Sequence, residues 1–268
     1  MTREQLIQTI HQRKSFLCVG LDTDIEKIPA HLHLFDDPVF EFNRRIIDAT
    51  KEYCVAYKLN TAFFESLGAK GWLAMEKTFA YIGKSHFTIA DAKRGDIGNT
   101  CDMYAKAFFK EMDVDSITLA PYMGKDSVEP FLKYENKWSI ILGLTSNPSA
   151  ADFQFTKNES GKELYKSVIS TASTWGNSSN TMFVVGATKA EMLGEIRQIV
   201  PDHFLLVPGV GAQGGSLKYV VEFGKNKDVG LLINSSRGII YASSGEDFEE
   251  RASEEAKKIA ISMAMLLE

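Results

Sequence analysis

Short apolar runs alternate with amphipathic segments along most of the chain. The eight apolar runs lie at residues 15–22, 54–60, 86–93, 115–121, 138–146, 181–188, 203–211 and 229–236. Each has the length and β-branched content of a strand that is buried on both faces of a parallel sheet. Helical patterns between them occupy, among others, residues 37–53, 97–113 and 187–200. Eight strand-helix repeats predict right-handed βαβ units that close into an α/β fold, the (β/α)8 TIM barrel.

The chain is predicted to be a single domain over residues 1–268. Its length is close to the ~250 residues typical of such a barrel, and no linker or change of composition divides it. A doubly wound open sheet is the alternative, but it usually has fewer strands. One connection, Thr145–Glu163, is long and polar and follows the fifth strand, so we expect it to act as a lid.

Composition narrows the class of protein. Hydrophobic residues make up 44% and charged residues 24%, as in an ordinary globular protein, and the net charge of -5 argues against nucleic-acid binding. The first residues read as an amphipathic helix without a signal peptide's apolar core, and no apolar stretch reaches the ~18 residues of a membrane span. Three cysteines without paired spacing indicate neither disulfides nor zinc. We therefore expect a cytoplasmic protein that does not bind membranes.

Polar residues follow nearly every predicted strand at its carboxyl end, where the active sites of these barrels lie. They are Asp22 after the first strand, Lys58 and Asn60 at the second, Asp91 and Lys93 at the third with Asp96 beyond it, and Thr145 and Ser146 at the fifth. The five histidines lie mostly at predicted helix or strand starts, which favours surface or capping roles over catalysis.

The stretch ADAKRGDIGNT, residues 90–100, concentrates charge at one strand end. Asp91 and Lys93 are two residues apart on an extended strand, so their side chains leave on the same face. An isolated pair would suggest a salt bridge at the barrel rim, but Asp96 adds a second anion nearby. A lysine beside carboxylates is stabilised as an ammonium ion. That favours a proton donor or electrostatic anchor over a Schiff-base nucleophile, which needs a neutral amine.

The loops after the seventh and eighth strands predict a phosphate site. The sequence GVGAQGG offers flexible backbone amides followed by a helix start, and Arg237 lies just past the eighth strand. Arginine can hold a phosphate through two parallel hydrogen bonds. Tight turns alone would explain the glycines, but the same two loops form the phosphate site of many such barrels.

These motifs resemble those of one family. DAKRGDIGNT is similar to the Asp-x-Lys-x-x-Asp-Ile-Gly-x-Thr signature of the orotidine 5'-phosphate decarboxylase family, whose members make UMP. VGLD, YKLNTAFFE, APYMG, GLTSNP, PGVGAQGG and NSSRGIIYA also stand in the expected order, so the resemblance covers nearly the whole chain. TAFFE, APYMG and the chain length resemble the longer branch of the family. Ser216 departs from the pattern, since relatives often carry an acid there.

The resemblance implies a decarboxylation that needs no metal and no cofactor. Asp91 would lie beside the carboxylate of orotidine 5'-phosphate, and Lys93 would protonate C6 after carbon dioxide leaves. Asp96 and Thr100 would reach into the neighbouring subunit's site, which implies a homodimer with shared active sites. The other implied contacts hold the substrate: Asp22, Lys58 and Asn60 at the ribose, Ser146 or alternatively Thr145 at the pyrimidine, and Gln213 and Arg237 at the phosphate.

Two other functions are compatible with parts of the pattern. Magnesium-dependent decarboxylases and aldolases of sugar phosphates resemble this chain in the Asp-x-Lys-x-x-Asp core, but they carry an acidic metal ligand at the end of the second strand. Here that position is Lys58, whose charge would repel a divalent cation. The second alternative is a nucleotide-binding barrel that has lost catalysis. The presence of every expected catalytic residue argues against it.

Overall fold

The computed structural model describes residues 1–186, 190–210 and 216–267, which form a closed barrel of eight strands in chain order. All neighbouring strands are parallel. The strands are β1 (Leu17–Gly20), β2 (Ala56–Asn60), β3 (Phe87–Arg94), β4 (Ser116–Leu119), β5 (Trp138–Leu144), β6 (Thr181–Val185), β7 (Phe204–Pro208) and β8 (Leu231–Ser235). Each falls on one of the apolar runs, so the predicted (β/α)8 architecture is confirmed.

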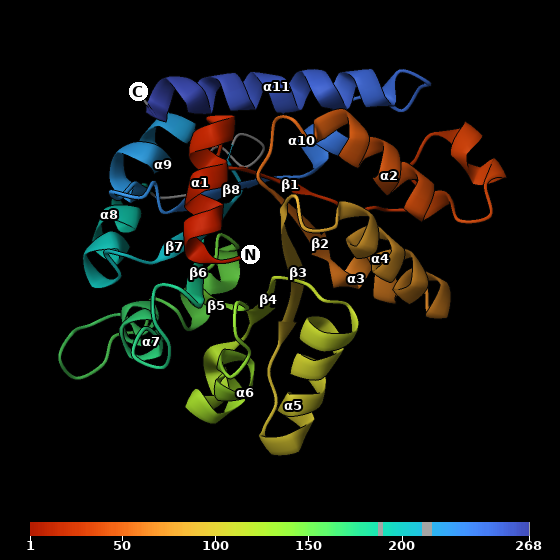
Figure 1. Ribbon diagram of the computed structural model, residues 1–268. Coiled ribbons are helices and arrows are strands. Elements are labelled where there is room, and N and C mark those ends of the chain that lie inside the picture. Colours follow the sequence, from red (N-terminus) through yellow and green to blue (C-terminus); the bar gives the residue numbers. More distant parts are fainter. Residues whose placement is uncertain (187–189, 211–215, 268) are drawn as a thin grey trace.

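Helices surround the barrel (Figure 1). The α-helices are α1 (Arg3–Arg13), α2 (Pro38–Thr50), α3 (Thr61–Glu65), α4 (Ala69–Ile82), α5 (Gly98–Lys106), α6 (Glu129–Leu132), α7 (Leu164–Ala172), α8 (Ala190–Ile199), α9 (Leu217–Gly224), α10 (Arg237–Ile240) and α11 (Phe248–Leu267). Short turns of 3-10 helix are η1 (Ala30–Leu34), η3 (Pro121–Met123), η4 (Lys125–Ser127) and η5 (Pro148–Asp152), and a π-helical turn, η2 (Ala107–Glu111), extends α5. The long α11 packs beside α2, α9 and α10 (Figure 1). Among the described residues, no helix is long and apolar enough to cross a membrane.

Sequence-local chemistry fixes where helix α2 begins. At α2, the Asp37 side chain accepts a hydrogen bond from the amide of Phe40 at 3.1 Å, and Pro38 takes the first helical position, where no amide is needed. The buried face of this helix includes Phe42 and Ile46, which are both fully buried. The amphipathic pattern therefore places the apolar side of α2 against the barrel.

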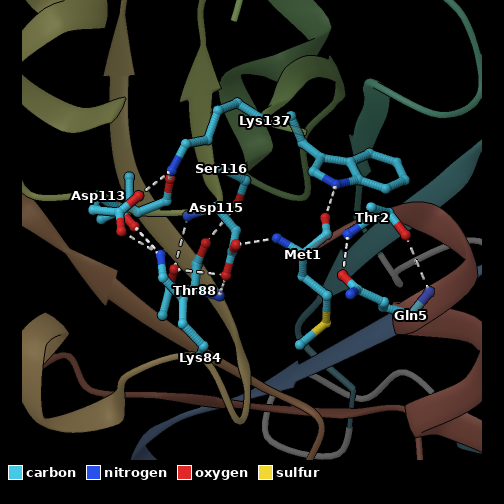
Figure 2. A network of polar contacts seen from close by, with 11 residues as sticks. Met1, Thr2, Gln5, Lys84, Thr88, Asp113, Asp115, Ser116 and Lys137 are labelled. Carbon is cyan, nitrogen blue, oxygen red and sulfur yellow. Dashed lines mark hydrogen bonds and ion pairs between the residues drawn. The ribbon is translucent and has the colours of Figure 1, made fainter. Parts of the chain in front are cut away.

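A polar network closes the amino-terminal end of the barrel (Figure 2). The Met1 ammonium forms an ion pair with Asp115, which directly precedes β4. The other carboxylate oxygen of Asp115 accepts hydrogen bonds from the amide and the hydroxyl of Thr88, both at 3.0 Å. Arg3 adds an ion pair with Asp228 at 2.9 Å, just before β8. These contacts lie at the opposite end of the strands from the predicted active site.

At the carboxyl end, β3 departs from regular pairing. It keeps register with β2 up to the pair Asn60↔Asp91. On its other side the pairs are Ala90↔Ile117 and then Arg94↔Leu119, so four steps along β3 (94 − 90) match two along β4 (119 − 117). Extra residues in one strand make a β-bulge, which re-aims side chains. The bulge contains Asp91 and Lys93.

Candidate active site

A cavity of about 360 Å³ opens at the carboxyl ends of the strands. This volume is within the range of small-molecule sites. Eight of the eleven site residues predicted from the sequence line it: Asp22, Lys58, Asn60, Asp91, Lys93, Thr145, Ser146 and Arg237. The barrel therefore brings the predicted residues from five strand ends together in one cavity.

Four charged side chains form a row of alternating sign across the cavity. The Nζ of Lys58 lies 3.3 Å from Oδ1 of Asp22 and 2.9 Å from Oδ2 of Asp91. Oδ1 of Asp91 in turn lies 2.6 Å from the Nζ of Lys93. Within this row, the lysine held between two carboxylates is thus Lys58, and Lys93 stands at the end of the row.

The environment keeps the row ionised. Burial opposes the charged form of Lys58, but the carboxylates of Asp91 and Asp22 outweigh it and keep the lysine's pKa above its usual value. Burial likewise disfavours the Asp91 carboxylate, yet Lys58 and Lys93 lower the pKa of Asp91 to about 2. Lys93 itself is 49% exposed and faces the cavity. A molecule in the cavity can therefore reach the ammonium of Lys93, which is paired with Asp91, and Asp91 is in turn paired with the buried Lys58.

Asp96 and Thr100 do not line this cavity. The carboxylate of Asp96 accepts a hydrogen bond from the amide of Ile97 at 2.8 Å, and Thr100 is exposed on α5. Gln213, the other predicted phosphate ligand, lies outside the described residues. The structure therefore places eight predicted residues together and two apart from them.

Arg237 marks the end of the cavity formed after β7 and β8. It is exposed and, within the part of the chain that is described, forms no ion pair. Gly209 and Ser236 line the same end. A Cβ on Gly20 would lie 1.8 Å from Oγ of Ser236, so glycine is needed there for the β8 loop to approach β1. An arginine without an internal carboxylate partner is available to an anionic ligand.

The loop after β5 forms another wall. The hydroxyl of Thr145 donates to Oδ1 of Asn147 at 2.6 Å and accepts from Nε2 of Gln154 at 2.7 Å. Oε1 of Gln154 also accepts from the Thr145 amide at 2.9 Å, so the predicted lid segment is tied to the strand end. Apolar side chains from β5, β6 and β7 complete the wall, namely Leu142, Val184, Leu206 and Pro208.

Sequence reasoning missed two polar residues near the charged row. Thr118 on β4 donates to Oδ1 of Asp91 at 3.0 Å, and Asn234 on β8 lines the cavity. Both lie inside apolar runs, so only the alternation of side chains along those strands could have indicated them. Among the described residues, no group of three or more His, Cys, Asp or Glu side chains is placed to hold a metal ion.

Comparison with known proteins gives a consistent result over the whole chain. Residues 15–250 match the family described as orotidine 5'-phosphate decarboxylase / HUMPS. The orotidine 5'-phosphate decarboxylase of Flavobacterium johnsoniae is 62% identical, over 100% of this chain and 99% of the relative, and that of Christiangramia forsetii is 60% identical with the same coverage. The solved OMP decarboxylase of Leishmania donovani is 36% identical with a TM-score of 0.82, over 97% of this chain and 99% of that one.

Proposed function

The chain belongs to the orotidine 5'-phosphate decarboxylase / HUMPS family and decarboxylates orotidine 5'-phosphate to UMP, and we propose that it does so without a metal ion, with Lys93 as the proton donor. This reaction is the last step of de novo pyrimidine nucleotide biosynthesis. The observation that carries the proposed mechanism is the row of Asp22, Lys58, Asp91 and Lys93 in the cavity.

Loss of carbon dioxide leaves a very basic carbanion at C6 of the pyrimidine. An ammonium that is already aimed at that carbon stabilises the charge as it develops and then supplies the proton. Lys93 fits this role because it is exposed to the cavity and held by Asp91 at 2.6 Å. Lys58 neutralises the other oxygen of Asp91, so that carboxylate can stay ionised close to the carboxylate of the substrate.

The remaining cavity residues are assigned to different parts of the substrate according to their chemistry. Asp22 and Lys58 would hold the ribose hydroxyls, with Asn60 nearby, and Arg237, with Gln213, would hold the phosphate. We assign the pyrimidine contact to Ser146, with Thr145 as the second possibility, because both line the cavity at the end of β5. We take residues 1–268 as one catalytic domain. A cytoplasmic location is supported by the three cysteines, which are buried and unpaired.

Turnover is expected to be the same in excess EDTA as in its absence. Lys58 occupies the position at the end of β2 where the sugar-phosphate enzymes would need an acidic metal ligand, and its charge repels divalent cations. The measurement is the ultraviolet absorbance change as orotidine 5'-phosphate is consumed, with magnesium added back as a control. Activity that disappears in EDTA and returns with magnesium would contradict the metal-free mechanism.

We also propose a homodimer with shared active sites. Exposed apolar side chains occur next to Asp96, at Ile97 (57% exposed), on α5, at Met103 (59%), and on η3, at Tyr122 (97%) and Met123 (46%). A Cβ on Gly95 would lie 3.7 Å from Cε of Met123, so the turn that carries Asp96 lies beside η3. Exposed apolar side chains that gather on one part of a surface mark interaction sites. A second copy of the chain packed on this surface would bring its Asp96 and Thr100, which do not line their own cavity, to the neighbouring Lys93.

Mixing inactive Lys93→Ala protein with inactive Asp96→Ala protein is expected to restore activity. If each site takes Lys93 from one subunit and Asp96 from the other, every mixed dimer has one intact site. Random exchange of subunits in a two-fold dimer should then give about one quarter of wild-type activity. Each variant alone, taken through the same exchange, is the control. Mixtures that exchange subunits, as followed by mass spectrometry, but stay inactive would exclude shared sites.

A further inference from the structure

Lys93 has a backbone conformation that is unusual inside a strand. Its φ is 47°, and among the described non-glycine residues with positive φ it is the one that lies within a strand. Residues with a Cβ avoid this left-handed region because the Cβ crowds the following carbonyl oxygen. Such conformations persist where the surrounding contacts hold them in place, and they are concentrated at functional sites. The contacts around the β3 bulge therefore hold Lys93 in this conformation.

On the outer side, contacts with neighbouring elements hold Arg94, the residue that follows Lys93. Its carbonyl accepts a hydrogen bond from the amide of Ala120 at 2.9 Å, and its guanidinium pairs with Glu65 and lies 5.4 Å from the ring centre of Tyr104. These contacts fix where the bulge ends. They do not determine where the Lys93 side chain points, which depends on contacts on the inner side of the strand.

On the inner side, one hydroxyl contacts both catalytic residues. Thr118 lies on β4 between the paired residues Ile117 and Leu119, opposite the bulge, and is 1% exposed. Its Oγ1 accepts a hydrogen bond from the backbone amide of Lys93 at 2.9 Å and donates one to Oδ1 of Asp91 at 3.0 Å. That same oxygen of Asp91 lies 2.6 Å from the Lys93 ammonium.

We propose that Thr118 is a positioning residue for the decarboxylation, an inference that rests on the proposed role of Lys93. Thr118 does not line the cavity, so it acts through Lys93 and Asp91. By accepting from the amide, Thr118 satisfies a partly buried donor that regular strand pairing would have satisfied. It thereby stabilises the left-handed backbone that turns Lys93 toward the cavity. By donating to Oδ1 of Asp91, Thr118 fixes the position of the carboxylate oxygen that pairs with the Lys93 ammonium.

Replacing Thr118 with valine is expected to lower kcat roughly 10- to 100-fold, the loss that a misplacement of about 1 Å can cause. Valine fills almost the same volume but can neither accept from the Lys93 amide nor donate to Asp91. The KM for orotidine 5'-phosphate and the calorimetric affinity for UMP should stay close to wild type, because the ribose and phosphate contacts are unchanged. A wild-type kcat in Thr118→Val would overturn the proposal.

Thr88→Val is a matched control at the other end of the barrel (Figure 2). The Thr88 hydroxyl also donates to a buried aspartate, Asp115, at 3.0 Å and accepts from an amide, that of Asp115, at 2.8 Å. Its loss should lower the unfolding temperature but leave kcat per folded enzyme unchanged. Equal loss of kcat in the two valine variants would mean that the effect is structural, which contradicts a positioning role.

Thr118→Ser and Thr118→Ala form a second pair, which decides the question if Thr118→Val does not fold. Both lack the methyl group and differ in the hydroxyl alone, so the serine enzyme should keep most of the wild-type kcat and the alanine enzyme should lose it. Equal kcat values in this pair would refute the inference. Wild-type and Lys93→Ala turnover of orotidine 5'-phosphate are measured in parallel, so a failure of the proposed role of Lys93 appears there and is not confused with a failure of the role of Thr118.

Discussion

The Lys93→Ala enzyme is expected to turn over orotidine 5'-phosphate at least ~10²- to 10⁴-fold more slowly than wild type, the range for a lost general acid. Alanine removes both the proton donor and the positive charge that faces the developing carbanion. The measurement is kcat from the absorbance assay under saturating substrate. A Lys93→Ala enzyme with near-normal kcat would contradict the proposed mechanism.

The fold of Lys93→Ala should survive, which separates a catalytic effect from a structural one. Asp91 would keep its contacts with Lys58 at 2.9 Å and Thr118 at 3.0 Å, so no carboxylate is left buried without a partner. Lys77→Ala is a matched control, because Lys77 on the outer helix α4 is 52% exposed and pairs with Asp37 at 2.9 Å. Both variants should unfold near the wild-type temperature, and Lys77→Ala should retain full activity.

The barrel could be predicted because its signal is redundant. Eight apolar runs of similar length, separated by amphipathic segments, leave few folds that bury every run on both faces. The site followed from the same argument, since residues such as Asp22 and Lys58 stand at strand ends and parallel strands bring their carboxyl ends together. Their contact at 3.3 Å bears this out for two residues that are 36 positions apart.

The role of Thr118 could not be predicted, because its contacts with β3 depend on the irregular pairing of β3 and β4. A β-bulge leaves no clear mark in the sequence DAKRGD, and without it nothing indicates that Thr118 would face Lys93 rather than pack as a core residue. The expected surface position is wrong for His86, which is 3% exposed, whereas the expected capping role agrees with its contact to the carbonyl of Lys51, the C-cap residue of α2. Hydrogen bonds to the Lys51 carbonyl and to Ser85 satisfy its ring, and burial lowers its pKa to about 4. Such partners are brought together only by the tertiary fold.

Replacing Arg237 with alanine is expected to lower kcat/KM for orotidine 5'-phosphate by roughly 10²-fold or more, because a charge-assisted contact in a closed pocket costs ~2–5 kcal/mol when truncated and about 1.4 kcal/mol is tenfold. Arg237 lines the cavity, and among the described residues it has no carboxylate partner, so its charge is available to the phosphate. The phosphate is remote from C6, so its binding energy would act by closing the site around Lys93 and would appear in the barrier as well as in KM. Steady-state kinetics with and without added guanidinium, which should partly restore the rate, measures this.

The comparison that decides the role of Arg237 uses orotidine, the substrate without its phosphate. If the arginine acts through the phosphate, the wild type should decarboxylate orotidine very slowly, and Arg237→Ala should slow it little further because the lost partner is already absent. Arg251→Ala serves as the control, since Arg251 is 49% exposed on α11 and, in the part of the chain that is described, forms ion pairs only with the nearby Asp247 and Glu254. An equal penalty of Arg237→Ala on orotidine and on its phosphate would show that the arginine contacts another part of the substrate, and the loops after β7 and β8 would then lose their assignment as the phosphate site.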